Sequence, residues 1–174
     1  MTAMTHIYTG DGKGKTSCAL GLALRFSGYG GNVIIVQFGK GRDTGELAAL
    51  AKIPNIKVLR NNRDFGFWSN MTEESKNELR TENDANLSTA ISEVKNGNCG
   101  LLVLDEVISA YKNGAVDRQI VDTLLNEKPP KTELVLTGRN APQSFIERAD
   151  YVSEIKKVRH PFDKGIGARE GVEF

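Results

Sequence analysis

Short apolar runs alternate with amphipathic segments along almost the whole chain. Continuous apolar stretches at residues 6–8, 32–38, 101–104 and 134–136 are typical of strands that are covered on both faces. Between them, apolar side chains recur every three or four positions, as in helices with one buried face. This alternation predicts an α/β fold, in which a mostly parallel sheet carries helices on both faces.

The same pattern gives the expected order of elements. They are a strand ending at Tyr8, helix 17–26, strand 32–38, short helix 46–52, strand 56–59, helix 72–95, strand 101–106, helix 116–126, strand 133–139, short helix 142–148 and strand 151–155. Asn70 and Glu73 have the spacing of a capping box before the long helix, and Asn96-Gly97 suits its end. Pro129-Pro130 should halt the helix 116–126, and residues 158–174 should be mostly irregular.

The glycine-rich stretch Thr9 to Ser17 lies between the first strand and the first helix. This order of elements, closed by Lys15-Thr16, is that of a phosphate-binding P-loop. Glycines let backbone N–H groups approach an anion, and the helix start favours negative charge. The loop is one residue shorter than the usual pattern, so a structural glycine-rich turn is the alternative. Lys13 argues against it, because a structural turn needs no second lysine.

Two other strand ends carry polar residues. Asp105 and Glu106 end an apolar strand, where a carboxylate can reach magnesium beside a P-loop. The alternative is that these acids only favour the start of a helix. The basic loop 39–42 follows another strand, at the sheet edge where ligands collect, although a solvated turn also explains it.

Composition narrows the class of protein. A chain of 174 residues suggests one domain, residues 1–174, and a net charge of +1 gives no basic field for nucleic acid. Cys18 and Cys99 lie in apolar patterns without metal-site spacing, so we expect two buried, reduced thiols. No apolar run is long enough for a signal core or a membrane span, and a cytoplasmic protein is expected. The guanine-reading Asn-Lys-x-Asp pattern is absent, which favours ATP.

Five motifs occur together in a set order. They are Gly10 to Thr16, Val36-Gln37-Phe38, Leu104-Asp105-Glu106, Thr137-Gly138-Arg139 and Arg159 to Gly165, which contains His-Pro-Phe-Asp. Together they resemble the P-loop type of ATP:corrinoid adenosyltransferase over almost the whole chain. The resemblance implies a P-loop NTPase-like (RecA-like) fold. It also implies that a Co(I) corrinoid attacks the 5′-carbon of ATP and releases triphosphate, in adenosylcobalamin biosynthesis or salvage.

The resemblance assigns roles to particular residues. It implies ATP contacts by Gly10, Asp11, Gly12, Lys13, Gly14, Lys15, Thr16, Ser17 and Arg139, with Lys13, Lys15 and Glu106 catalytic. Mg²⁺ or Mn²⁺ would be held by Thr16, Glu106 and Asp105. Corrinoid contacts would come from Phe67, Trp68, His160, Phe162 and Asp163. For His160 a capped or packed surface histidine is the alternative, and the aromatic residues could instead anchor their loop on the sheet.

The resemblance also implies a flavodoxin-like or flavin reductant and a homodimer. Two departures from the family stand out. Gly66-Phe67-Trp68 is one residue shorter than the common Gly-Phe-x-Trp, and only eight residues precede Thr9, so we expect any cover over the site to come from elsewhere. Another P-loop kinase or ATP hydrolase, or a non-catalytic switch or corrinoid carrier, would fit the same loop. The phosphate product distinguishes these three activities.

Overall fold

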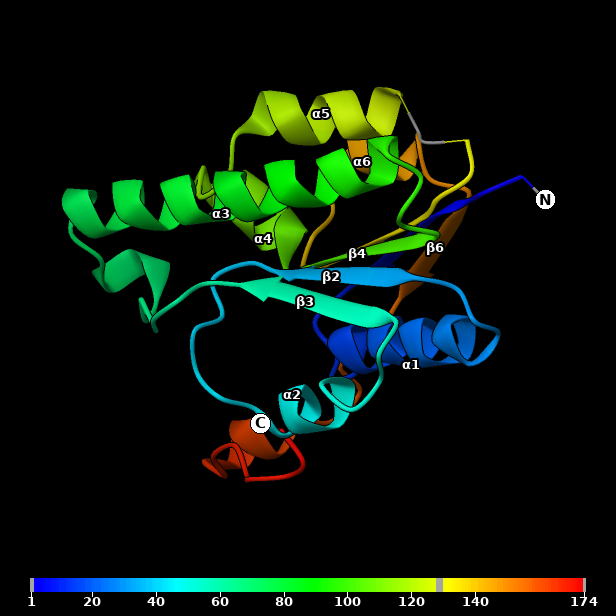
Figure 1. Cartoon of the computed structure of the whole chain (residues 1–174). Coiled ribbons are helices and arrows are strands. Elements are labelled where there is room, and N and C mark those ends of the chain that lie inside the picture. The colour runs from blue at the N-terminus through cyan, green and yellow to red at the C-terminus, as the bar shows by residue number, and fades with distance from the viewer. Residues whose placement is uncertain (1, 128–129, 174) are drawn as a thin grey trace.

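A six-stranded, all-parallel sheet forms the centre of the molecule (Figure 1). The computed structural model describes residues 2–127 and 130–173. The strands are β1 (Thr5–Thr9), β2 (Val33–Gln37), β3 (Ile56–Arg60), β4 (Leu101–Asp105), β5 (Glu133–Thr137) and β6 (Tyr151–Glu154). Their order across the sheet is β3-β2-β4-β5-β1-β6, so the first strand of the chain lies between the last two.

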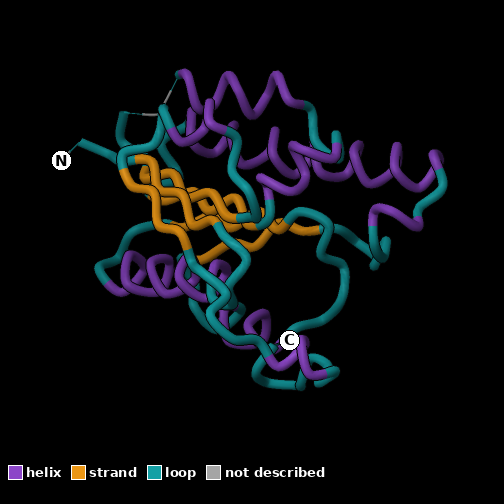
Figure 2. The backbone as a smooth tube through the Cα atoms, turned by 180° about the vertical axis from the view of Figure 1, so that it is seen from behind, coloured by secondary structure: helices purple, strands orange, loops and turns teal. Residues whose placement is uncertain are grey.

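Helices cover both faces of this sheet, as the sequence predicts (Figures 1 and 2). One face carries α1 (Lys15–Gly28) and α2 (Gly45–Leu50). The other carries α3 (Glu73–Lys95), α4 (Val107–Asn113), α5 (Arg118–Asn126) and α6 (Gln143–Ile146). There are two short 3-10 helices: η1 (Trp68–Asn70) lies between β3 and α3, and η2 (Pro161–Lys164) lies in the tail after β6.

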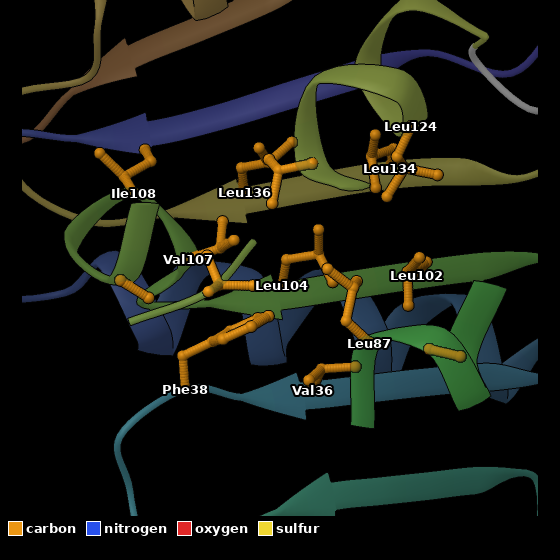
Figure 3. Close-up of a cluster of buried hydrophobic side chains, with 14 of the residues drawn as sticks. Val36, Phe38, Leu87, Leu102, Leu104, Val107, Ile108, Leu124, Leu134 and Leu136 are labelled. Atoms are coloured by element: carbon orange, nitrogen blue, oxygen red, sulfur yellow. The ribbon is translucent and has the colours of Figure 1, made fainter. Parts of the chain in front are cut away.

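The core is divided into two clusters, one on each face, because successive side chains of a strand point to opposite faces. Leu102 and Leu104 of β4 point toward α3, α4 and α5, where they join Leu134, Leu136 and their neighbours (Figure 3). Leu101 and Val103 point the other way and pack with Ala19 and Ala23 of α1 and with their neighbours. Strands β2 and β4 are buried at every position, which explains their unbroken apolar sequences.

Most expected elements are confirmed, with ends that shift by one to a few residues, but α4 was not expected. The chain turns from β4 into α4 at Glu106, whose left-handed backbone (φ 65°) lets the helix begin without a polar linker. The apolar start of α4 therefore follows directly after the two acids that end the strand segment. The helix expected from Val116 begins instead at Arg118, where the Asp117 carboxylate accepts the Gln119 N–H.

Three further expectations meet different outcomes. The capping box at Asn70 and Glu73 is wrong, because the Thr72 hydroxyl caps α3 by accepting the Ser75 N–H at 3.2 Å. Helix α5 ends at Asn126, and Pro129 lies outside the described residues. Residues 158–173 are mostly irregular as expected, apart from η2.

The expectation of two buried thiols holds for only one of them. Cys18 is exposed, because it lies off the buried face of α1, which includes the neighbouring Ala19 and Ala23. Cys99 is buried, and its thiol donates to the Leu101 carbonyl oxygen at 3.2 Å. Burial raises the pKa of the Cys99 thiol to about 11. Within the described part of the chain, no helix is long and apolar enough to cross a membrane.

Candidate functional site

The phosphate loop connects β1 to α1 at the carboxyl edge of the sheet. Gly14, with φ 123°, lies immediately before α1 in a conformation that side-chain-bearing residues rarely adopt. The free N–H groups at the start of this helix form a site for an anion. Lys15 is buried there and donates to the Gly12 carbonyl oxygen at 2.8 Å.

Charges of both signs surround Lys15. Burial is the main reason that the pKa of its ammonium group is lowered. The negative charge of Glu106 opposes this shift, whereas the positive charge of Arg139 adds to it. Glu106 and Arg139 are therefore both close enough to Lys15 to influence its ammonium group.

The segment after β6 holds the phosphate loop in place. The Ile155 N–H donates to the Thr9 carbonyl oxygen at 2.8 Å, and the Gly12 N–H donates to the Ile155 carbonyl oxygen at 2.7 Å. A Cβ at Gly10 or Gly12 would overlap the backbone of Ile155; at Gly12 it would lie 2.8 Å from the carbonyl oxygen. These two glycines thus allow close approach of the chain's own backbone, a role that the sequence did not suggest.

Asp105 is the buried acid of the site. Its Oδ1 accepts from the Thr16 hydroxyl at 2.9 Å and from the Thr137 hydroxyl at 2.7 Å. Its Oδ2 pairs with the Lys40 ammonium at 2.6 Å, and the carboxylate is completely shielded from solvent. The ends of β4 and β5, the phosphate loop and the 39–42 loop therefore meet at one carboxylate. Lys40 belongs to the basic loop seen in the sequence, but its partner there could not be predicted.

Glu106 points in another direction from Asp105. Its N–H donates to the Thr137 hydroxyl at 2.8 Å, while its side chain accepts from the Ser109 hydroxyl of α4 at 2.8 Å. Of the two acids expected to hold a metal, Asp105 is the one bonded to Thr16. Glu106 lies on the Lys15 side of the site.

The C-terminal tail also reaches the phosphate loop. Glu173 accepts from the Lys13 ammonium at 2.9 Å and from the Arg169 guanidinium at 3.0 Å. A cavity of about 490 Å³ lies beside this contact. Its lining includes Thr16, Ser17, Lys40, Arg42, Glu46 and Glu173. Glu173 was missed in the sequence, because nothing local shows that the chain's end returns to its beginning.

The aromatic loop after β3 is joined to the 39–42 loop. Arg42 pairs with Asp64, and the Arg60 guanidinium donates to the carbonyl oxygens of Lys40 and Arg42. Phe65 and Trp68 are partly buried against the core, whereas the Phe67 side chain is 79% exposed. Trp68 thus fits the anchoring alternative, and Phe67 is available to a ligand.

The His160 segment is more exposed and less connected. His160 Nδ1 accepts the Phe162 N–H at 3.1 Å, which makes it the cap of η2 and matches the alternative of a surface histidine. Asp163 pairs with Lys157 at 2.8 Å, and Phe162 is 74% exposed. The segment lies beyond α2, toward the carboxyl edge of the sheet (Figure 1). Within the described residues, these hydrogen bonds and ion pairs stay inside residues 157–163 and do not reach Asp11, Ser17 or the rest of the phosphate loop.

Nucleotide-binding proteins of one class share a loop between a strand and a helix, and an acid from a neighbouring strand beside the loop's Thr. The β1–α1 loop and the Thr16–Asp105 bond reproduce that arrangement, and this chain is a P-loop protein.

Comparison with known proteins gives the family within this class. Residues 1–174 match the family model described as ATP:corrinoid adenosyltransferase BtuR/CobO/CobP. The chain belongs to this family, and it is an enzyme that transfers the adenosyl group of ATP to a corrinoid.

Curated relatives agree with the family model. A corrinoid adenosyltransferase of Pseudomonas aeruginosa is 36% identical over 169 residues, which cover 97% of this chain and 82% of the relative. One from Sinorhizobium sp is 32% identical over 183 residues, covering 97% and 78%. One from Escherichia coli K12 is 29% identical over 168 residues, covering 97% and 84%. A solved structure, "T48 deacetylase with substrate", is 11% identical, with a TM-score of 0.28 over 99% of this chain and 96% of that one.

Proposed function

We propose that the triphosphate of ATP lies in the loop Gly10 to Ser17 and leaves from there as one unit. The observation that carries this proposal is the buried Lys15 at the start of α1, whose ammonium lies within the loop and donates to the Gly12 carbonyl oxygen. Lys13, which pairs with Glu173, and the exposed Arg139 add further positive charge near Lys15. Such a cluster suits a polyanion that carries several charges at once.

The reaction requires little covalent chemistry from the protein. Cobalt of the Co(I) corrinoid supplies an electron pair to the 5′-carbon of ATP, and a cobalt–carbon bond forms. The bond from that carbon to the triphosphate oxygen breaks, and its electrons leave with triphosphate. Because negative charge grows on the departing oxygen, Lys13, Lys15 and Arg139 stabilise the transition state more than bound ATP. The protein's tasks are to position the two substrates and to stabilise the leaving group.

The residues beside the loop fit a magnesium ion. Among the described residues there is no cluster of three acidic, histidine or cysteine side chains. Magnesium needs no such cluster, since it is commonly held by one or two carboxylates, water and the phosphates of the substrate. We propose that Asp105 and the Thr16 hydroxyl are its first contacts and that Glu106 is a further one. When bound, the ion would neutralise charge on the triphosphate.

We further propose that the aromatic loop meets the corrinoid through Phe67. An exposed ring covers a large area and offers no lone pair strong enough to bind cobalt. It could therefore replace an axial ligand on the lower face of the corrin ring and ease the reduction of Co(II). His160, Phe162 and Asp163 remain candidates for the corrinoid's edge.

Product analysis tests the first of these proposals. Under anaerobic conditions, purified protein would be incubated with ATP, magnesium and chemically reduced cob(I)alamin. Phosphorus nuclear magnetic resonance would then identify the phosphate products. We expect one triphosphate for each adenosylated corrinoid, and none when corrinoid is omitted. ADP with phosphate would instead indicate a kinase or hydrolase, and binding without any product would indicate a switch or carrier.

Magnesium titrations test the metal contacts. We expect Asp105→Asn and Glu106→Gln both to raise the magnesium concentration needed for half the maximal rate, with the larger effect at Asp105. Far-ultraviolet circular dichroism would confirm that each variant is folded. An unchanged magnesium curve for either variant would remove that residue from the proposed site.

Three expectations stay predictions of this proposal, the first two drawn from the family resemblance and the third from the lack of a long apolar run in the sequence. They are a flavodoxin-like or flavin reductant, a homodimer and a cytoplasmic location. Sedimentation of the purified protein tests the dimer, and activity with reduced flavin or flavodoxin in place of a chemical reductant tests the electron donor.

A further inference from the structure

The ammonium group of Lys40 lies against the two side chains proposed to hold magnesium. Its Nζ is 2.6 Å from Asp105 Oδ2 and 3.5 Å from the Thr16 hydroxyl oxygen. Asp105 is fully buried, and a buried carboxylate without a partner is strongly unfavourable. Lys40 thus supplies the positive charge that this carboxylate needs in the protein without nucleotide.

The backbone of Lys40 is anchored independently of its side chain. The Arg60 guanidinium donates to the Lys40 carbonyl oxygen at 3.3 Å. The next residue, Gly41, packs so tightly on the Arg63 backbone that a Cβ there would overlap it. The side chain itself is 28% exposed and ends in the cavity beside the phosphate loop. A lysine has four rotatable bonds, so its ammonium can change partners while the loop stays in place.

Lys40 and magnesium cannot occupy the same oxygens of Asp105 and Thr16, because the two cations repel each other at that distance. Once displaced, the ammonium has the phosphates on the neighbouring loop as its nearest new acceptors. We propose that Lys40 is an exchangeable counter-ion: it pairs with Asp105 when the site is empty and moves to the triphosphate when magnesium and ATP bind. This inference rests on the proposed magnesium site.

The proposal predicts that removing the Lys40 charge changes two binding affinities in opposite directions. In Lys40→Met, which keeps the length but removes the charge, the nucleotide-free protein should bind Mn²⁺ about tenfold more tightly, because a competing cation is gone. The same variant should bind inorganic triphosphate with magnesium about tenfold more weakly, because it lacks one charge-assisted contact. Electron paramagnetic resonance of free Mn²⁺ measures the first affinity, and calorimetry measures the second.

Matched variants separate exchange from a structural role. Lys52→Met removes an exposed lysine outside the site and should leave both affinities as in the wild type. Lys40→Gln removes the positive charge of Lys40 but keeps a hydrogen-bond donor for Asp105. If Lys40→Met does not fold, Lys40→Gln should show the same tighter Mn²⁺ binding and weaker triphosphate binding. Thermal unfolding would verify the fold of each variant.

The possible outcomes are distinct. Tighter Mn²⁺ with weaker triphosphate supports the exchange. Weaker binding of both ligands, or no change in either, would mean that Lys40 is a fixed partner of Asp105, and the proposal would be wrong. Tighter Mn²⁺ with unchanged triphosphate would exclude the transfer. If wild-type protein bound no Mn²⁺ even with ATP, the proposed metal site itself would fail, a result separate from the failure of Lys40 alone.

Discussion

The individual side chains of the site have separate tasks although they lie close together. Lys15 donates to the Gly12 carbonyl oxygen of the phosphate loop, Asp105 accepts from two hydroxyl groups and pairs with one ammonium, and Glu106 contacts the start of α4. Adjacent positions in the sequence therefore serve different parts of the site. The change of direction occurs at the left-handed backbone of Glu106, which separates its side chain from that of Asp105.

Lys15→Ala should abolish turnover and weaken ATP binding. The loss of one charge-assisted contact to phosphate costs about 1.5–3 kcal/mol in binding, and the transition state should lose more because the leaving group gains charge. Calorimetric ATP titration and a single-turnover assay measure the two effects. A variant with near-wild-type kcat would exclude Lys15 from the leaving-group site.

The two thiols should differ sharply in reactivity. Cys18 is exposed, whereas Cys99 is buried and stays protonated until the pH approaches its raised pKa of about 11. The thiolate is the reactive form, so iodoacetamide at pH 8 should label Cys18 and spare Cys99. Mass spectrometry reads the labels, and urea-unfolded protein, in which both cysteines react, is the control. Labelling of both in the folded protein would contradict this assignment.

At the scale of elements, glycines in the phosphate loop differ from those in helices. Gly12→Ala places a methyl group against the Ile155 backbone, so we expect a loss of about 1–3 kcal/mol of stability together with weaker ATP binding. Gly21→Ala in α1 meets open space and should instead stabilise the protein by about 0.5–1 kcal/mol. Urea unfolding compares the two. If both substitutions changed the free energy of unfolding equally, the Ile155 backbone would have to move aside for the new methyl group without loss of stability.

The two aromatic residues of the loop should have different roles: Trp68 anchors the loop on the core, and Phe67 contacts the corrinoid. Phe67→Ala should slow the reaction that starts from Co(II) corrinoid, spare much of the rate with pre-reduced Co(I), and leave the melting temperature unchanged. Trp68→Ala removes a side chain packed on the core and should lower the melting temperature by several degrees. Equal loss of activity from both cobalt states in Phe67→Ala would place the corrinoid wall elsewhere.

Helices and strands with a local sequence signal were predictable. An element that begins where the chain turns without a turn or cap signal was not. The phosphate loop is contiguous, and β2 and β4 are unbroken apolar runs, so each carries its own signal. Helix α4 lacks such a signal, because it has only seven residues and no side-chain cap hydrogen bond at its N-terminus. The cap of α3 is Thr72 rather than Asn70, because Asn70 is the last residue of η1 and α3 begins only at Glu73.

At the scale of the whole molecule, the site depends on contacts that sequence patterns do not contain. The strand order places β1 between β5 and β6, and a parallel α/β pattern is compatible with many orders. The partners of Lys40 and Lys13, namely Asp105 and Glu173, are 65 and 160 residues away. Their residue types were visible in the sequence, but their pairing is a product of topology.

Glu173→Gln should raise the affinity for ATP. The Arg169 guanidinium, followed by Lys13, holds the pKa of the Glu173 carboxyl well below its ordinary range. The lowered pKa means that this contact is present above the ordinary carboxyl pKa and is lost only as the pH falls through the depressed one, so Glu173 occupies Lys13 at neutral pH. Its removal frees Lys13 for phosphate, which calorimetry at pH 7 would detect. Weaker binding would show instead that Glu173 holds Lys13 in a productive position.

The position of β1 between the two last strands has a consequence for the chain during its synthesis. The phosphate-loop sequence leaves the ribosome first, but the Ile155 carbonyl that fixes Gly12 emerges only near the end. At typical elongation rates this interval is on the order of ten seconds. Through that time the nascent chain carries the sequence of a nucleotide site without its shape. Fragments from premature termination should therefore neither sequester ATP nor compete for corrinoid.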